Sequence, residues 1–178
     1  MNNEYMPFIS EIKEIIKHTD IEYTFRMTYD GDVKPGQFFE VSIPTFGEAP
    51  ISVSGIGEGT VDLTIRKVGK VTNEIFTNYV GNKLFLRGPY GNGFDVNDYK
   101  GKEVTIVAGG TGLSPVKAVV DYFAQNTSEA VHTNLICGFK SIDFKSSNSV
   151  IFIFITFLFL EHHKAKKLFN QEQLVIST

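Results

Sequence analysis

Residues 104–115, Val-Thr-Ile-Val-Ala-Gly-Gly-Thr-Gly-Leu-Ser-Pro, decide how the fold of this 178-residue chain is interpreted. The first five form an apolar run, which predicts a strand buried on both faces. The run passes directly into the glycine turn 109–112, and Pro115 suits the first turn of a helix expected over residues 114–125. Residues 132–137 predict a second, parallel strand, so this part of the chain forms one β-α-β unit.

The glycine turn between this strand and helix is a candidate phosphate-binding element. Glycines let the phosphates of a cofactor approach the backbone, and a helix N-terminus supplies unpaired N–H groups and a positive dipole end. The turn is not G-x-G-x-x-G, and it lacks the lysine of a P-loop. Taken alone, it fits a nucleotide site and a ligand-free β–α turn about equally.

The first hundred residues follow a different pattern. Apolar and polar side chains alternate over short runs between glycine-containing turns, which predicts an antiparallel β-barrel or sandwich. The runs are residues 21–29, 38–43, 51–54, 61–65 and 83–87. Residues 8–17 have apolar positions at helical spacing but β-branched content suited to a strand, and both alternatives stay open. One short helix is expected over residues 73–79, capped by Thr72 and followed by Gly81.

Two glycine-containing segments of this half are candidates for a site or a turn. Residues 68–72, Val-Gly-Lys-Val-Thr, are a second candidate anion cradle, in which Gly69 permits close approach and Thr72 offers a hydroxyl and an N–H group. A capped helix without a ligand is the simpler interpretation of this segment. Residues 88–93, Gly-Pro-Tyr-Gly-Asn-Gly, are expected to form a rigid turn between the barrel and the second unit.

The composition excludes several classes of protein. The net charge is −3 and charged residues make up 21%, which favours neither a disordered chain nor a nucleic-acid-binding protein. Cys137 is the one cysteine, so this chain alone forms neither a disulfide nor a four-thiolate iron–sulfur cluster. The four histidines lack metal-ligand spacing, and no metal site is expected. Because the first residues do not resemble a secretory signal, we expect a reduced cytoplasmic setting.

The last 40 residues differ in composition from the rest of the chain. They contain no glycine and no proline, and they are rich in Phe, Ile, Ser, Lys and Asn. The apolar stretch 150–160 is shorter than the roughly 20 residues of a membrane-spanning helix, so a buried strand or a segment that does not fold is favoured over a membrane tether. Out-of-frame reading of an A/T-rich coding sequence would produce such an ending. Our hypothesis is therefore a truncated or frameshifted relative of a longer protein.

Four segments, in their order and spacing, resemble the ferredoxin–NADP reductase superfamily. They are residues 49–52 (Ala-Pro-Ile-Ser), 65–72 (Ile-Arg-Lys-Val-Gly-Lys-Val-Thr), 88–94 (Gly-Pro-Tyr-Gly-Asn-Gly-Phe) and 109–115 (Gly-Gly-Thr-Gly-Leu-Ser-Pro). More closely, the chain is similar to the electron-transfer subunits of dihydroorotate dehydrogenase and of anaerobic sulfite reductase, and most of all to the latter. The resemblance covers about residues 5–140.

The resemblance implies a fold with two domains. A six-stranded antiparallel Greek-key barrel that binds FAD occupies residues 1–100. A partial parallel α/β domain that binds NAD(P) occupies residues 101–140, and an atypical Phe/Ile-rich tail occupies residues 141–178.

The resemblance also implies which residues contact the cofactors. The flavin ring lies against Pro50, Ile51 and Ser52, and the Ser52 hydroxyl is the catalytic group near flavin N5. The ribityl chain and ring edge follow Ile65, Arg66 and Lys67, and the pyrophosphate is held by Gly69, Val71 and Thr72. The nicotinamide nucleotide faces Gly110, Thr111 and Gly112. Many relatives have an arginine at the position of Ala49 that contacts the phosphates. Its absence here leaves Arg66 and the Thr72 segment to offset the pyrophosphate charge, and on that basis FAD is favoured, with FMN as the alternative.

The implied function is electron transfer from NAD(P)H through FAD to an iron–sulfur partner, as in sulfite reduction. The partners would be iron–sulfur or sulfite reductase subunits of a complex, and we expect no iron–sulfur cluster in this chain. Because the nucleotide domain is incomplete, an inert flavin-binding or partner-docking module is the alternative. A third hypothesis is a barrel tethered to a membrane by residues 150–160.

Overall fold

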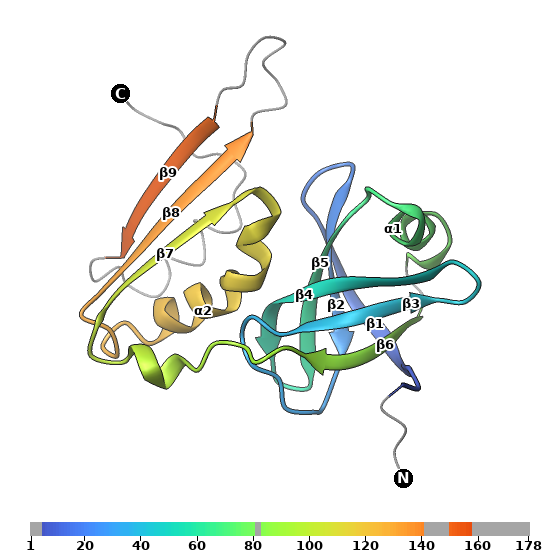
Figure 1. Cartoon of the computed structure of the whole chain (residues 1–178), viewed down its shortest axis with the longest axis horizontal. Helices are drawn as coiled ribbons and strands as arrows, with labels where there is room; N and C mark the ends of the chain where they lie inside the picture. The colour runs from blue at the N-terminus through green and yellow to red at the C-terminus, as the bar shows by residue number, and fades with distance from the viewer. Residues whose placement is uncertain (1–4, 81–82, 141–149, 158–178) are drawn as a thin grey trace. The chain divides into compact units, whose positions relative to one another are not determined.

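The computed structural model describes residues 5–80, 83–140 and 150–157 (Figure 1). The chain divides into two compact units, Met1–Phe94 with Ser114–Ala118, and Asp95–Leu113 with Val119–Thr178. The first unit contains a β-barrel, and the second contains the parallel strands expected from the sequence.

Six antiparallel strands close the barrel in the order β1-β2-β5-β4-β3-β6. The strands are β1 (Phe8–Lys17), β2 (Glu22–Thr28), β3 (Phe38–Ile43), β4 (Gly47–Gly57), β5 (Thr60–Arg66) and β6 (Lys83–Tyr90). Because β1 pairs with both β2 and β6, it closes the barrel and settles the ambiguous first segment as a strand. The prediction of a six-stranded antiparallel barrel is confirmed.

Alternate residues of these strands point into the barrel and form one apolar core. Phe25, Met27, Phe39, Leu63 and Ile65 are fully buried. Burial of each such side chain stabilises the fold by roughly 1.5–3 kcal/mol. The residues between them face outward, so the side of each strand that a ligand can reach is set by this alternation.

The short helix of the barrel begins earlier than its sequence suggests. Helix α1 spans Lys70–Glu74 and continues as the π-helical turn η1 (Ile75–Tyr79). Thr72 was expected as the N-cap, but Gly69 holds that position with an extended backbone, φ −145° and ψ 179°. Thr72 lies inside the first turn, where its hydroxyl binds back to the chain before it. The expected Gly81 terminator lies outside the described residues.

Strand β6 includes part of the segment that was expected to be a turn. Tyr90 pairs with Phe38 of β3, so the chain reverses only beyond Tyr90, where Gly91 has φ 86°. Gly88 is needed inside the strand because its φ is 133° and an added Cβ would lie 3.1 Å from the carbonyl oxygen of Phe38. Composition alone predicted the turn but not the additional pairing with β3.

The second unit is built on a three-stranded sheet in the order β7-β8-β9. Its elements are the 3₁₀ turn η2 (Val96–Tyr99), β7 (Glu103–Gly109), the 3₁₀ turn η3 (Gly110–Gly112), α2 (Leu113–Gln125), β8 (His132–Lys140) and β9 (Val150–Phe157). Residues Ser114–Ala118 of α2 are grouped with the first unit. β7 and β8 are parallel, joined through η3 and α2, which confirms the predicted β-α-β unit. α2 buries Val119, Val120 and Phe123, which share one face of the helix.

Strand β7 is buried on one face, whereas its apolar sequence predicted burial on both. Val104, Ile106 and Ala108 are buried, but Val107 between them is 69% exposed. Within the described residues α2 is the only long helix of this unit, and it lies along one side of the sheet (Figure 1). One face of β7 is therefore left without a helical cover in the described part of the chain.

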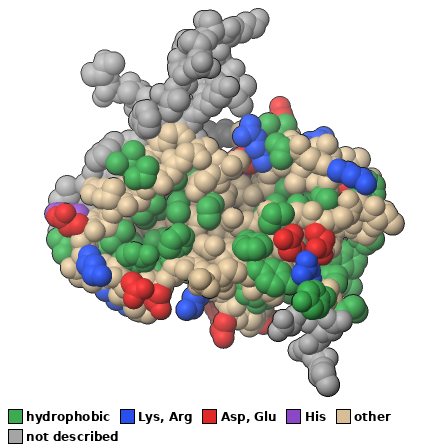
Figure 2. Space-filling model, viewed as in Figure 1, with side chains coloured by type: hydrophobic (Ala, Val, Ile, Leu, Met, Phe, Trp, Pro, Cys, Tyr) green, Lys and Arg blue, Asp and Glu red, His purple; other side chains and the backbone are tan. Residues whose placement is uncertain are grey.

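The apolar stretch 150–160 begins with a strand. β9 pairs antiparallel with β8 over residues 150–157, and residues 158–160 lie outside the described part. Among the described helices, none has both the length and the apolar character needed to cross a membrane. On the face shown in Figure 2, Lys and Arg side chains are interspersed with Asp and Glu side chains.

Candidate functional site

Strand β4 divides the predicted flavin-contact residues between the two faces of the barrel wall. Ala49 and Ile51 pair with the buried Val41 and Phe39 of β3 and pack against the core. Pro50 and Ser52 fall at the alternate positions and face outward. A ligand on the outer surface would therefore meet the side chains of Pro50 and Ser52, and Ile51 through its backbone.

Two aromatic residues lie beside Ser52 on the outer face. Phe38 pairs with Ser52 on one side and with Tyr90 on the other, so the three form a row across β4, β3 and β6. The rings of Phe38 and Tyr90 lie 5.8 Å apart between centroids at 46°. Ser52 is half-buried, and among the described residues its hydroxyl makes no hydrogen bond. A hydroxyl beside aromatic rings suits the edge and face of a planar heterocycle.

An ion pair fixes the edge of this row. Arg87 donates from Nη2 to Glu48 Oε2 at 2.6 Å and from Nη1 to the Tyr90 hydroxyl at 2.9 Å. Ser42 also donates to Glu48 Oε1 at 2.6 Å. These hydrogen bonds, that from Arg87 above all, lower the pKa of Glu48. The Glu48 hydrogen bond in turn raises the pKa of Arg87.

Sequence reasoning did not select Phe38, Arg87 or Tyr90 as site residues. Phe38 and Arg87 were assigned to strands, and Tyr90 to a turn. The available signal was the position of each residue in its strand, but only the pairing register of β3 with β4 and β6 brings them beside Ser52.

The end of β5 places Ile65, Arg66 and Lys67 in three different environments. Ile65 is fully buried in the core, and Lys67 is exposed. Arg66 faces outward, yet its Nε is buried without a hydrogen-bond partner. A buried donor without a partner is costly, so this guanidinium is suited to bind an anion or a carbonyl of a ligand.

The segment between β5 and α1 has the geometry of a helix start. The Thr72 hydroxyl accepts hydrogen bonds from the N–H groups of Val68 at 3.0 Å and Gly69 at 2.9 Å. Thr72 and Val71 are buried, so their side chains serve the turn and the core. At Gly69 an added Cβ would meet only Thr72 Oγ1, at 4.0 Å, which leaves open space beside the backbone. The first-turn N–H groups have no partner within the helix.

The glycine turn of the second unit, η3, is exposed throughout. Gly110 has φ 52°, a conformation that favours glycine. Gly112 has φ −64° and ψ −10°, which any residue can adopt, and an added Cβ at either position would meet nothing within 4 Å. The conformation explains Gly110, but nothing in the described chain requires glycine at Gly112. Open space above Gly112 fits the close approach of a ligand.

No group of three or more His, Cys, Asp or Glu side chains in the described part of the chain is arranged to bind a metal ion. Cys137 is buried in β8, and burial raises the pKa of its thiol. A buried neutral thiol is a poor nucleophile and a poor metal ligand.

Comparison with known proteins identifies relatives over the matched part of the chain. This chain is 41% identical over 95 residues to sulfhydrogenase 1 subunit gamma of Pyrococcus furiosus, and the match covers 52% of this chain and 32% of that subunit. It is 37% identical over 111 residues to the probable dihydroorotate dehydrogenase B (NAD(+)), electron transfer subunit, of Thermoplasma volcanium, covering 62% and 43%. The chain is a homologue of these two subunits. It spans less than half the length of either one, and no family model matches it.

Solved structures show the same fold at low sequence identity. The flavohem-like FAD/NAD binding domain of nitric oxide dioxygenase from Vibrio cholerae has a TM-score of 0.65 at 18% identity, covering 79% of this chain and 66% of that one. Ferredoxin–NADP+ reductase from Plasmodium falciparum has a TM-score of 0.63 at 14% identity, covering 77% and 61%. The predicted ferredoxin–NADP reductase-like fold is confirmed.

Proposed function

We propose that the barrel binds a flavin on its outer face, and that the chain serves as the electron-transfer subunit of a larger NAD(P)H-dependent oxidoreductase. The observation that carries the proposal is a pair of unsatisfied polar groups, one in the middle of β4 and one at the end of β5. The Ser52 hydroxyl has no partner among the described residues, and the Arg66 Nε is buried without one. The name of the homologous dihydroorotate dehydrogenase B (NAD(+)) electron transfer subunit supports the electron-transfer role.

Different residues of the outer face would contact different parts of the flavin ring. The Ser52 hydroxyl would donate to N5 of the ring, while Pro50 and the Phe38–Tyr90 row would support the ring face. Ile51 packs inward and would contribute its backbone. A bound flavin supplies the chemistry of accepting a hydride and releasing electrons singly, and the protein supplies orientation and electrostatics.

The pyrophosphate of FAD would lie at the start of α1. The N–H groups of Val71 and Thr72 and the open backbone at Gly69 can approach it, and Arg66 and Lys67 can offset its charge. Ala49 packs inward against the core and has no charged group to offer the pyrophosphate. We favour FAD over FMN because FAD alone has a pyrophosphate for this segment to bind.

The NAD(P)H donor would bind at η3 of the second unit. Gly110, Thr111 and Gly112 are exposed there, and the space above Gly112 admits a phosphate or ribose close to the backbone. We retain residues 1–100 as the flavin domain and 101–140 as the partial nucleotide domain. The electrons would leave to an iron–sulfur subunit of a complex, with a sulfite-reducing subunit as the specific candidate.

Anaerobic titration of the purified, flavin-loaded chain with NADH and with NADPH tests this function. Bleaching of the flavin absorbance by either nucleotide is the expected result, and the nucleotide that bleaches it faster is the donor that the chain prefers. A flavin-loaded chain that dithionite bleaches but neither nucleotide does would be the inert binding module instead. Ser52→Ala should slow reduction, with Thr28→Val as the matched control, because the Thr28 hydroxyl accepts a hydrogen bond from the Glu11 N–H away from this site.

A further inference from the structure

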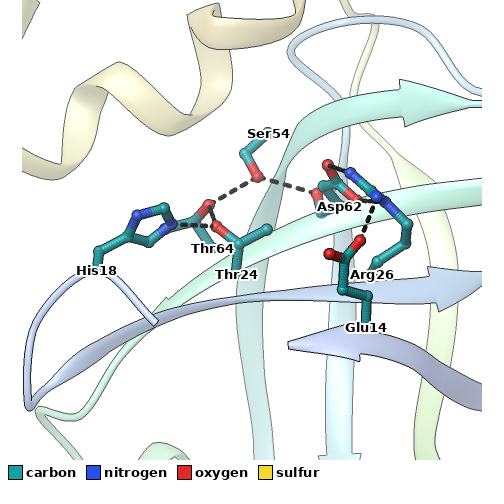
Figure 3. Close-up of polar contacts among 7 residues, drawn as sticks. All are labelled: Glu14, His18, Thr24, Arg26, Ser54, Asp62 and Thr64. Atoms are coloured by element: carbon teal, nitrogen blue, oxygen red, sulfur yellow. Dashed lines mark hydrogen bonds and ion pairs between the residues drawn. The ribbon is translucent and has the colours of Figure 1, made fainter. Parts of the chain in front are cut away.

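Two rows of polar contacts cross the outer face of the barrel wall and meet where Ser54 of β4 donates to Asp62 of β5 (Figure 3). One row consists of hydroxyls and ends at a histidine, and the other consists of charged groups. Their members are His18, Thr24, Thr64 and Ser54 in the first row, and Glu14, Arg26 and Asp62 in the second. Neither row belongs to the flavin-contact residues discussed above.

The hydroxyl row is continuous from an exposed histidine to a buried serine. His18 Nε2 lies 2.7 Å from Thr24 Oγ1, and Thr24 Oγ1 lies 2.8 Å from Thr64 Oγ1. Thr64 Oγ1 is in turn 2.8 Å from Ser54 Oγ, which donates to the carbonyl oxygen of Asp62 at 3.1 Å. Ser54 is 1% exposed, so an unsatisfied hydroxyl there would be costly.

The end of the row fixes its direction. A hydroxyl has one proton, and that of Ser54 goes to the Asp62 carbonyl, so Thr64 donates to Ser54 and Thr24 to Thr64. His18 must then donate from Nε2 to Thr24. The reverse direction would make three hydrogen bonds in place of four, because Ser54 would have no proton for the carbonyl. The row therefore selects the Nε2–H form of His18.

The charged row binds the carboxylate of Asp62, whereas the hydroxyl row ends at the backbone carbonyl of the same residue. Arg26 donates from Nε to Oδ1 at 2.8 Å and from Nη2 to Oδ2 at 3.0 Å, and it also pairs with Glu14. The Asp62 hydrogen bond raises the pKa of Arg26. A Cβ added at Gly55 would lie 2.8 Å from Asp62 Oδ2, so the held carboxylate leaves room only for glycine opposite it.

Both rows converge on a bulge in β4. Val53 pairs with Leu63, but the next pair along β5 is Asp62 with Gly55, so Ser54 is the extra residue. A strand alternates its faces, and each bulge shifts that alternation by one residue. The site of the bulge therefore decides which residues of β4 face outward. If it moved to the other side of Ser52, that residue would change face relative to β5.

We propose that the His18–Thr24–Thr64–Ser54 row, together with Asp62, fixes the β4 bulge at Ser54 and so positions Ser52 on the outer face. These are positioning residues, since none of them is placed against the ligand. The proposal rests on the proposed flavin function for its consequence, but the row and the bulge are properties of the protein alone.

Thr64→Val in the full chain tests the proposal, because it keeps the shape of the side chain and removes the hydroxyl that joins the two halves of the row. Thr64→Ser, which restores the hydroxyl, is the rescue variant. Thr28→Val is the matched control, since Thr28 Oγ1 accepts a hydrogen bond from the Glu11 N–H at 2.9 Å elsewhere in the barrel. If Thr64→Val does not fold, Ser54→Ala removes the last member of the row instead.

Two measurements read the row without flavin. Nitrogen-15 NMR should show the Nε2–H form of His18 in the wild type and in Thr64→Ser, and a mixture of tautomers in Thr64→Val. Amide exchange at Ser54 and Gly55, the two residues of the bulge, should be faster in Thr64→Val and unchanged in Thr28→Val. An Nδ1–H form in the wild type, or unchanged exchange in Thr64→Val, would overturn the proposal.

The affinity for flavin tests whether loss of the hydroxyl row displaces Ser52. We expect Thr64→Val to weaken binding roughly fivefold to tenfold, about the effect of one lost hydrogen bond, and Thr64→Ser and Thr28→Val to change it less than about twofold. Equal losses in Thr64→Val and Thr28→Val would mean a general stability effect and would overturn the positioning role. If the wild type binds no flavin, the proposed function fails, while the NMR result still decides whether the row fixes the bulge.

Discussion

Thr72 allows a direct test of whether a turn hydroxyl shapes the protein or touches the cofactor. Its oxygen accepts from the N–H groups of Val68 and Gly69 at 3.0 and 2.9 Å, and it donates to the Gly69 carbonyl at 3.2 Å. The side chain is 6% exposed. Thr72→Val removes these three contacts and keeps the shape, whereas Thr72→Ser keeps them and removes one methyl group.

The expected loss follows from the number and exposure of the bonds. A hydrogen bond contributes about 1 kcal/mol net, and loss of a capping interaction at a helix start costs about 1 kcal/mol. Val68 and Gly69 are exposed, so water can replace part of what Thr72→Val removes. We therefore expect the flavin-free protein to lose about 1–2 kcal/mol of unfolding free energy in Thr72→Val, and less than about 1 kcal/mol in Thr72→Ser.

Urea unfolding of the flavin-free variants, followed by circular dichroism, measures this loss. The structure assigns the hydroxyl to the turn, so stability and flavin affinity should fall together in Thr72→Val and recover together in Thr72→Ser. A Thr72→Val protein with wild-type stability but weakened flavin binding would refute the assignment, because the hydroxyl would then serve the cofactor and not the turn.

Three further predictions follow from other parts of the structure. Ile65→Ala should cost about 3 kcal/mol of stability, because the side chain is fully buried, whereas Arg66→Gln should leave stability within about 1 kcal/mol and weaken flavin binding; urea unfolding and flavin titration separate the two. Gly110→Ala should destabilise the second unit by about 1 kcal/mol, because the backbone of Gly110 has a φ of 52°. Gly112→Ala should leave stability unchanged and weaken NAD(P)H binding, because an added Cβ there fills open space beside the backbone. Equal nucleotide affinity in Gly112→Ala and the wild type would contradict the site. The pKa of Glu48 is lower in the folded protein than its ordinary value of 4.5, so the ionised carboxylate stabilises the fold above the pKa of the unfolded chain, and this stabilisation is lost as the pH falls through the pKa of the folded protein. Glu48→Gln should therefore lose less stability than the wild type as the pH falls below about 4.5. Parallel profiles of stability against pH would contradict the ion pair.

Local sequence patterns predicted which segments form strands and helices better than they predicted where α1 begins and how deeply β7 is buried. Alternation of apolar and polar residues in β2, β3 and β5 reflects a wall with one buried face, and the sequence shows it directly. The start of α1 was misplaced because Thr72 is a strong capping residue by type, whereas the cap is set by the extended backbone of Gly69. The burial of β7 was overestimated because an apolar strand does not reveal how many helices cover it.

The candidate site depends on the pairing register of β4 with its neighbouring strands, and no short stretch of sequence determines that register. The resemblance pointed to residues 49–52 as one contact segment, but pairing with β3 sends Ile51 inward and Ser52 outward. The same pairing brings Phe38 and Tyr90 beside Ser52 from strands far apart in the chain. On its other side β4 pairs with β5 through a one-residue bulge at Ser54, and no local signal in the sequence marks that bulge.

The flavin content of the purified full chain tests the central claim most directly. The protein is incubated with FAD or FMN, freed of unbound cofactor by gel filtration, and its bound flavin is released and quantified against protein. We predict one flavin per chain, with FAD retained more strongly than FMN and with retention reduced in Arg66→Gln. A folded barrel, verified by circular dichroism, that retains neither flavin would contradict the account.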